Sequence, residues 1–399
     1  MMKKEKDISG WKVLTGNVAA AHAVALCRPD VVASYPITPQ TSILEQLYKF
    51  SAEGILKSQL INVEGENSAM SALMGAAACG GRVFTATSSN GLAFMYDAYV
   101  FAAGNRVPIV MAIAMREQVS PQCVAAGQDA VQVKDQGWIQ LYAESCQEIL
   151  DMIIMAYRLS EDKDILIPVN VCFEGFYLSY MSQNVNVPTF EEVEQFLSPL
   201  KEMKRTVWSL EEPLHFSSYI LGNLFMEYRH KHTAAFNRAK EKFEEINRDF
   251  AAQFGRNFGG QIEEYRTEDA DIVMITMGAA SGTAKSVIDE MRDGGLKVGL
   301  VRIRMFRPFP KEKLAEAVKG KKAIGVIDRN VLCGWDCGHV FLEMSAVQNR
   351  FKLQIPMVGF IDGLAGADIS EAHIGRAIQT TVAAAEGKET KEVTWLALE

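Results

Sequence analysis

Three short stretches carry side chains suited to chemistry, and each follows an apolar, β-rich run and precedes a helical pattern. Tyr35-Pro36-Ile37-Thr38-Pro39 offers a hydroxyl between two prolines, residues 63–66 (VEGE) offer two carboxylates, and residues 87–91 (TSSNG) form a turn of small polar residues. In an open α/β sheet, positions of this kind lie at the carboxyl edge of the strands, where ligands bind. We therefore expect all three stretches to meet at one crevice.

Each stretch also has a purely structural interpretation. The prolines around Thr38 fix φ and remove hydrogen-bond donors, so taken alone they favour a rigid turn over a turn that aims the hydroxyl at a small anion. Glu66 could simply favour a helix dipole. It could also be a carboxylate walled in by small residues, whose raised pKa suits proton exchange with a heterocyclic nitrogen. For Glu66 both interpretations remain open.

The turn at 87–91 lacks the lysine of a P-loop, so phosphate binding there has weak support. Arg116 directly follows the apolar run 108–115 and is either a surface charge or a fork that binds a carboxylate. The polar segment 116–134 has no clear period and is longer than an ordinary connection. It is typical of a functional loop.

Strands alternating with helices predict a doubly wound α/β domain over residues 1–186. A charged, helical segment follows over 187–267, and a second α/β domain is expected over 268–399. The first domain begins with a helix over 16–29 that Asn17 can cap. The predicted strands are 31–37, 59–64, 82–87, 108–115, 166–173, 271–277, 297–304, 322–328 and 355–361, and residues 137–142 are expected to be ordered.

The composition of the 399-residue chain is that of an ordinary soluble protein, with 48% hydrophobic and 23% charged residues. Its net charge of −8 argues against a nucleic-acid or anionic-membrane partner. The charged N-terminus meets no apolar segment, and no apolar run reaches the length that spans a bilayer. We expect a cytoplasmic protein.

The seven cysteines are scattered, and only Cys333 and Cys337 lie close together. An iron–sulfur cluster needs four thiolates and a zinc site needs four ligands, which this spacing does not supply. We expect reduced thiols and no metal bound by this chain.

Taken together, the ordered motifs resemble the α subunit of the 2-oxoacid:ferredoxin oxidoreductases, and are most similar to the pyruvate synthase type. The resemblance spans nearly the whole chain. It rests on YPITP at 35–39, VEGE with its small-residue helix at 63–69, TSSNGL at 87–92, Arg116, DQGWIQLYAES at 135–145, RxRxFRPFP at 302–310 and the strand and turn at 323–329.

The resemblance implies a pyrimidine-type thiamine-diphosphate-binding domain, followed by a transketolase C-terminal-like α/β domain. It implies that Glu66 bonds the cofactor's aminopyrimidine ring, and that Thr38 and Arg116 hold the substrate carboxylate. Other cofactor contacts implied in this way are Pro36, Ser89 and Asn90.

The chain contains no Gly-Asp-Gly sequence, the start of the motif that binds Mg²⁺ and the diphosphate in thiamine enzymes. The family places that motif and the iron–sulfur clusters on other chains. The resemblance therefore implies a β subunit with the diphosphate and Mg²⁺ site, γ- and δ-type subunits, ferredoxin or a similar acceptor, and coenzyme A as acyl acceptor.

One loop departs from the pyruvate-type pattern, which usually carries an Asp-His-Ser-Asp-like run after the arginine. Here residues 125–129 read Ala-Ala-Gly-Gln-Asp, and of Gln128 and Asp129, which we expect to face the substrate, only Asp129 clearly matches. The loss of a bulky polar side chain favours a larger acid, so an aromatic 2-oxoacid such as phenylglyoxylate competes with pyruvate. The alternatives to an oxidoreductase α subunit are the β chain of a lipoamide-linked dehydrogenase and a non-catalytic assembly subunit.

Overall fold

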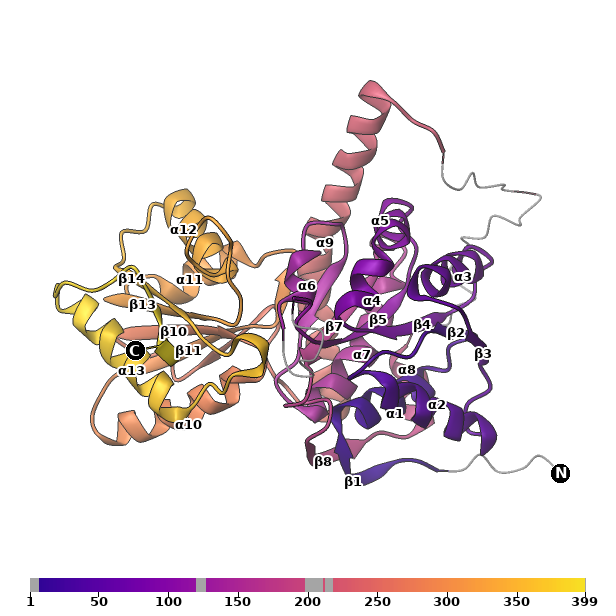
Figure 1. Cartoon of the computed structure of the whole chain (residues 1–399), viewed down its shortest axis with the longest axis horizontal. Coiled ribbons are helices and arrows are strands. Elements are labelled where there is room, and N and C mark those ends of the chain that lie inside the picture. Colours follow the sequence, from indigo (N-terminus) through magenta and orange to yellow (C-terminus); the bar gives the residue numbers. More distant parts are fainter. Residues whose placement is uncertain (1–6, 120–126, 198–210, 212–217, 399) are drawn as a thin grey trace.

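The computed structural model describes residues 7–119, 127–197, 211 and 218–398. These residues form two α/β units, each built on its own sheet (Figure 1). The loop residues Ala125 and Ala126 lie outside the described residues. None of the helices in the described part of the chain is long and apolar enough to cross a bilayer.

The first sheet has seven strands in the order β12-β6-β7-β5-β4-β2-β3. All neighbouring pairs are parallel except β12 with β6. The strands in this order are Met305–Arg307, Ile139–Tyr142, Val169–Glu174, Val110–Met115, Val83–Thr87, Val31–Ser34 and Gln59–Asn62.

Helices cover both faces of this sheet, which is why its central strands are apolar throughout. In β5, Val110, Ala112 and Ala114 face one layer, and the residues between them face the other. The first layer contains α1 (Gly16–Cys27), α2 (Thr41–Ala52) and α7 (Cys146–Ser160). The second contains α3 (Glu66–Ala78), α4 (Ser89–Phe94) and α5 (Tyr96–Gly104), and the short α6 (Asp129–Gln132) lies beside α4.

The second sheet has the order β15-β14-β13-β10-β11-β9 and is parallel except at β9. Its strands in this order are Val393–Trp395, Met357–Ile361, Ala323–Asp328, Ile272–Met277, Val298–Ile303 and Ile262–Tyr265. One face packs against α10 (Ala280–Asp293) and α13 (Glu371–Ala385), the other against α11 (Lys311–Val318) and α12 (His339–Phe351). Two short 3-10 turns are Leu364–Gly366 and Leu396–Leu398.

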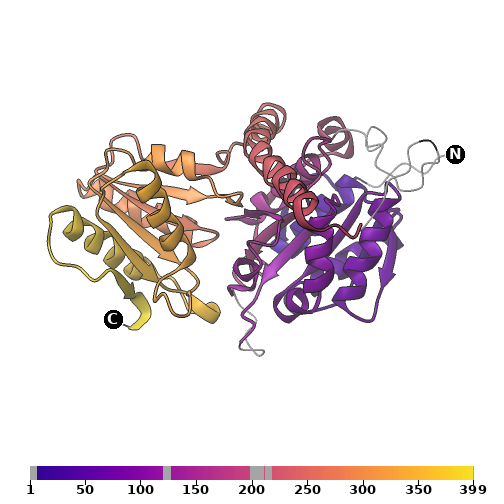
Figure 2. The ribbon, with the colours of Figure 1, turned by 90° about the horizontal axis from the view of Figure 1, so that it is seen from above.

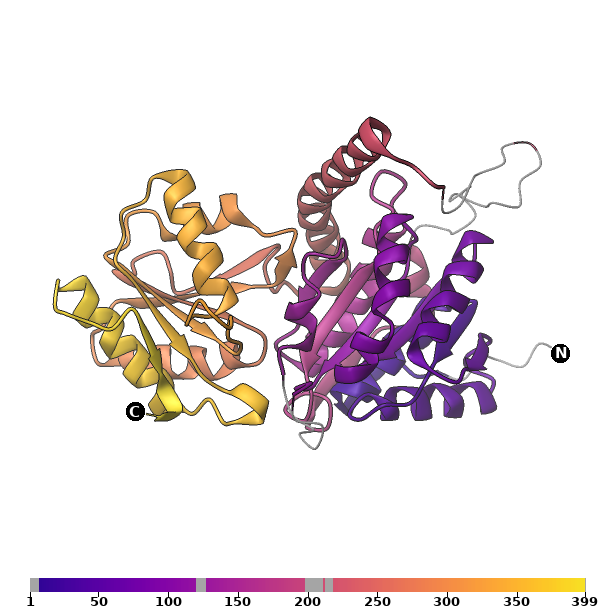
Figure 3. The same cartoon turned by 45° about the horizontal axis from the view of Figure 1, so that its top comes forward.

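The long helix α9 (Gly222–Phe254) lies over the first unit at the side of the second (Figure 2). Its C-terminal half buries Phe243, Ile246 and Phe250, whereas its N-terminal end is exposed and projects from the molecule (Figure 3). Helix α8 (Phe190–Phe196), which contacts α9, begins with a capping box. An antiparallel ribbon of β1 (Gly10–Thr15) and β8 (Ser182–Val187) completes the first unit.

Several local predictions need correction. The cap of α1 is Thr15, not Asn17, whose side-chain amide instead donates to Pro39 O at 2.6 Å and to Ser42 Oγ at 2.8 Å. β9, which falls inside the expected 187–267 segment, pairs with β11 of the second sheet. β12, which falls inside the expected 268–399 domain, pairs with β6 of the first. The boundaries themselves stay a prediction.

A buried ionic cluster joins the two units. Glu148 of α7 accepts from Arg302 Nη1 at 2.5 Å, from Arg302 Nη2 at 3.0 Å and from Arg304 Nε at 2.7 Å, and all three side chains are almost fully buried. Burial alone would raise the pKa of Glu148, but the two guanidinium groups lower it to about 2. Arg302 also pairs with Glu263 of β9, so the cluster holds the second sheet against α7.

We expect Glu148→Gln to destabilise the full-length chain by about 3–5 kcal/mol, because it leaves two buried guanidinium groups without their carboxylate. Scanning calorimetry measures the effect as a lower transition temperature. Because the folded pKa lies below 4.5, the pair's contribution is full above pH 4.5 and is lost as the pH falls through about 2. The control Glu227→Gln breaks an exposed pair with Lys231 on α9 and should leave the transition unchanged. Equal effects of the two variants would contradict a structural role of the cluster.

Candidate functional site

The predicted site residues lie around the carboxyl ends of four adjacent parallel strands, β5, β4, β2 and β3. Thr38 follows β2, Glu66 follows β3, Ser89 follows β4, and Arg116 follows β5. The parallel pairing therefore gathers these segments at one edge of the sheet, as the sequence pattern predicts.

Glu66 is the first residue of α3, and its side chain is 5% exposed. Its carboxylate lies against the turn after β4. A Cβ built on Gly91 would stand 2.4 Å from Glu66 Oε1 and 2.6 Å from Thr87 Oγ1. Only a glycine at position 91 leaves room for this carboxylate. Burial raises the pKa of Glu66, and a hydrogen bond from its own backbone amide partly opposes that rise.

The surroundings of Glu66 combine free polar atoms with an exposed ring. Thr87 Oγ1 and Ser88 Oγ are buried and have no hydrogen-bond partner among the described residues. Phe94 is 62% exposed, and its ring packs over Gly65, where a Cβ would stand 2.6 Å from Phe94 Cε1. A buried acid, unpaired hydroxyls and an aromatic face are the groups that a polar heterocycle needs.

Pro36 and Thr38 are both exposed, and hydrogen bonds from neighbouring side chains hold the turn that carries them. Gln40 Nε2 donates to Tyr35 O at 2.9 Å across the turn, and Asn17 Nδ2 donates to Pro39 O. The rigid turn expected from the prolines is therefore present, and the Thr38 side chain is left free to meet a ligand. Its contact with substrate stays a prediction.

Arg116 is 8% exposed, and its Nε atom lacks a hydrogen-bond partner within the described ranges. Asp129 is fully buried, and its Oδ2 accepts from the backbone amides of Ser89 at 2.6 Å and Arg116 at 3.1 Å. We expected Asp129 to face the substrate, but its carboxylate already accepts hydrogen bonds from these backbone amides. Gln128 Oε1 likewise accepts from Val331 N of the second unit at 3.0 Å. Asn90 is exposed, and the ligand contacts predicted for these residues are not tested by this geometry.

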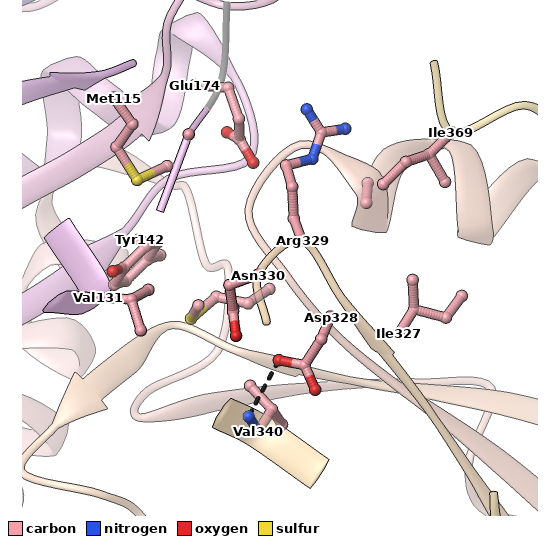
Figure 4. Close-up of a pocket in the computed structure, with 13 residues that line it drawn as sticks. Met115, Val131, Tyr142, Glu174, Ile327, Asp328, Arg329, Asn330, Val340 and Ile369 are labelled. Carbon is pink, nitrogen blue, oxygen red and sulfur yellow. Dashed lines mark hydrogen bonds between the residues drawn. The ribbon is translucent and has the colours of Figure 1, made fainter. Parts of the chain in front are cut away.

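Sequence reasoning missed a small cavity of about 20 Å³ between the two units, large enough for one or two water molecules. Figure 4 shows Glu174 of the first sheet and Arg329 of the second on opposite sides of it. Glu174 Oε1 accepts from Ala279 N at 2.9 Å, and a Cβ on Gly278 would overlap that oxygen at 2.1 Å. Glu174 Oε2 and Arg329 Nε are buried and unpaired in the part of the chain that the structure describes. The glycine at position 278 could have indicated that another group packs closely against this turn, but nothing in the sequence identified that group as Glu174.

Comparisons with known proteins agree with this geometry. Residues 22–248 match the thiamine-diphosphate-binding domain of pyruvate flavodoxin/ferredoxin oxidoreductases, and residues 270–374 match core domain II of pyruvate:ferredoxin oxidoreductase. The chain is 42% identical to pyruvate synthase subunit PorA of Methanothermobacter thermautotrophicus over 97% of this chain and 98% of that one. It is 41% identical to the α subunit of NADH-dependent phenylglyoxylate dehydrogenase of Aromatoleum evansii over 96% and 93%.

A solved 2-oxoglutarate:ferredoxin oxidoreductase from Magnetococcus marinus has the same fold, with a TM-score of 0.71 at 17% identity over 94% of this chain and 66% of that one. A split-gene transketolase is a more distant likeness, with a TM-score of 0.51 at 13% identity over 92% and 96%. The predicted fold class is confirmed: a thiamine-diphosphate-binding α/β domain precedes a second α/β domain.

The fold and the matched domains define a thiamine-diphosphate-binding subunit of an oxidoreductase. The chain belongs to the 2-oxoacid:ferredoxin oxidoreductase family and is an α subunit of such an enzyme complex. The predicted family and subunit type are therefore confirmed, and the lipoamide-linked β chain is set aside.

The residues present fit thiamine diphosphate on the pyrimidine side. The buried Glu66 carboxylate is available at the start of α3, and the unpaired Thr87 hydroxyl lies on the same side of Gly91. Within the described residues, no group of three or more His, Cys, Asp and Glu side chains gathers as a metal site.

We expect Gly91→Ala to lower turnover of the assembled complex at least about tenfold, because the new methyl group must displace the Glu66 carboxylate. Gly75→Ala is the matched control, since Gly75 lies on α3 with no atom within 4 Å of its built Cβ. That control should keep full activity and stabilise the helix by roughly 0.5–1 kcal/mol. Unchanged activity in the Gly91 variant would mean that Glu66 need not hold this position.

Proposed function

We propose that this chain supplies the pyrimidine-side half of a thiamine diphosphate site that oxidatively decarboxylates a 2-oxoacid to an acyl-CoA and CO2. The substrate is pyruvate or an aromatic 2-oxoacid such as phenylglyoxylate, and electrons pass to ferredoxin or a similar acceptor. When bound, thiamine diphosphate supplies the electron sink for loss of CO2. The observation that carries the proposal is the buried Glu66 carboxylate against Gly91.

Glu66 acts as the group that holds and exchanges a proton at its carboxylate oxygen. Its raised pKa favours the protonated form relative to an exposed glutamate, because burial disfavours the charged form. The Gly91 turn excludes any side chain from the space next to that oxygen. Pro36 and Asn90 are exposed at the same edge and would complete the contacts on this side, whereas the hydroxyl of the buried Ser89, the third predicted contact, already donates to Glu117 O.

Thr38 and Arg116 bind and orient the carboxylate of the 2-oxoacid. The guanidinium group of Arg116 is mostly buried, where a charged hydrogen bond to a carboxylate is stronger than in water. The exposed Thr38 hydroxyl, which follows β2 on the far side of β4, can donate to the same group. Together they would orient the acid relative to Glu66, and the predicted substrate-facing residues Gln128 and Asp129 lie where the chain returns to Arg116.

The partner subunits supply what this chain lacks. The absence of a Gly-Asp-Gly sequence supports a β subunit that carries Mg²⁺ and the diphosphate. Iron–sulfur clusters then belong to further subunits of the γ and δ type. The relatives named as pyruvate synthase and phenylglyoxylate dehydrogenase subunits support such an assembly.

The loop at 127 supports a substrate larger than pyruvate. A Cβ on Gly127 would stand 2.2 Å from Glu117 N and 2.3 Å from the carbonyl carbon of Arg116, so no side chain fits there. The pyruvate-type pattern places a polar residue in this run. This sequence difference, with the backbone of Gly127 packed directly on the Arg116–Glu117 peptide, is what favours an aromatic or branched acid.

Glu66→Gln in the assembled complex should reduce turnover by about 10²–10⁴-fold, because the amide cannot exchange the proton. Subunit composition, measured by size-exclusion chromatography of the complex purified through this chain, should not change. Retained turnover in an intact complex would instead support the non-catalytic assembly subunit.

Viologen reduction by the purified complex, with a panel of 2-oxoacids and with or without coenzyme A, tests the substrate. We expect coenzyme A-dependent reduction with phenylglyoxylate or a branched acid at a kcat/KM above that for pyruvate. Reduction confined to pyruvate would mean that the loop difference is neutral. No reduction with any acid, despite bound thiamine diphosphate, would refute the proposed reaction.

A further inference from the structure

The carboxylate of Asp129 lies between the ends of β4 and β5 and accepts three backbone amides. Its Oδ2 takes Ser89 N at 2.6 Å and Arg116 N at 3.1 Å, and its Oδ1 takes Ala130 N at 2.9 Å. We propose that Asp129 is a positioning residue that ties the backbone of Arg116 to the turn at Ser89 and so fixes Arg116 relative to Glu66. The inference rests on the proposed function, because it assumes that Arg116 binds the substrate carboxylate.

Further hydrogen bonds join the same two segments. Ser89 Oγ donates to Glu117 O at 3.1 Å, and Gln118 Nε2 donates to Ser89 O at 2.9 Å. Ser89 has φ of 48°, a left-handed conformation that a non-glycine residue adopts only when its surroundings impose it. The bonds from residues 116–118 and from Asp129 supply that constraint.

The return of the loop to Asp129 depends on Gly127. Its backbone lies directly on the Arg116–Glu117 peptide, so close that no Cβ fits. This contact brings the chain back against β5 two residues before Asp129. The carboxylate can then reach under the strand end to both amides.

The hydrogen bonds of Asp129 also affect the position of Glu66, through the short helix α4. Ser89 begins α4, and Gly91 in the same turn lies against Glu66 Oε1. A shift of Ser89 therefore moves Gly91 against the Glu66 carboxylate, and a shift of the Arg116 backbone moves the guanidinium group. One buried side chain thus sets the distance between the two groups that hold cofactor and substrate.

The carboxylate is the chemically suited group for this position. Both of its oxygens accept hydrogen bonds, whereas an asparagine would turn its own N–H donors against a backbone amide. Burial raises the pKa of Asp129 to about 6, although the amides of Ser89, Arg116 and Ala130 lower it and Glu117 adds a further rise.

The test uses the complex purified through this chain, with KM and kcat measured on its preferred 2-oxoacid. Asp129→Asn should raise KM at least about tenfold, since it disrupts charge-assisted hydrogen bonds, with bound thiamine diphosphate retained. Arg116→Ala should also raise KM. If Asp129 acts through Arg116, the double variant should have the KM of Arg116→Ala alone.

Two further variants separate positioning from folding. Asp151→Asn is the matched control and should leave KM unchanged. Asp151 on α7 is an equally buried carboxylate of the first unit and accepts from Arg256, which follows α9. Gln118→Leu removes one bond to Ser89 while keeping Asp129, and should raise KM roughly three- to tenfold. Gln118→Leu therefore tests the positioning role even if the complex with Asp129→Asn does not assemble.

The outcomes distinguish this inference from the proposed function. An unchanged KM in Asp129→Asn or in Gln118→Leu, with a raised KM in Arg116→Ala, overturns the positioning role alone. A KM effect of Asp129→Asn that adds fully to that of Arg116→Ala also overturns it. An unchanged KM in Arg116→Ala refutes both the substrate role of Arg116 and the inference built on it.

Discussion

The parallel pairing of β5, β4, β2 and β3 is the constraint on which the rest of the site depends. Thr87, the last residue of β4, stands beside Ile113, close to the end of β5 at Met115, so the segments that follow the two strands start near one another. A slip of one residue would exchange the two faces of the strand and turn buried side chains toward the opposite layer. Helix layers on both faces prevent such a slip, because each strand residue already fills a place in one core or the other.

The buried carboxylates differ in how many hydrogen bonds this chain donates to them. Glu148 and Asp129 are fully buried, and each accepts several hydrogen bonds from groups of this chain. Glu66 is nearly as buried, yet among the described residues its carboxylate receives only its own backbone amide. A buried carboxylate without a partner is costly unless a ligand completes it. The contrast supports Glu66 as a ligand-binding group and Asp129 as a supporting one.

Much of the fold could be predicted because its signals are local. Apolar runs closed by Gly or Pro identified the central strands, and ordered motifs identified the family that the comparisons confirm. The β1–β8 ribbon was missed because exposed Trp11 and Val13 break the pattern of a half-buried strand. Pairing of β12 with the first sheet, and of Asp129 with the amides of Ser89 and Arg116, depends on contacts across distant segments. Residue type alone does not reveal such targets.

The distribution of exposure explains why so much of this half-site is held rigid. Thr38, Asn90 and Phe94 are exposed, whereas Glu66 and Arg116 are buried, and Asp129 holds the backbone of Arg116. In the proposed site shared between subunits, one face forms only on assembly, so the residues of this chain cannot rely on the partner for their position beforehand. Preorganised groups avoid the cost of ordering side chains when ligand and partner bind. The Asn17 contact under the 35–39 turn and the Asp129 tie at β4 and β5 supply that order from within the chain.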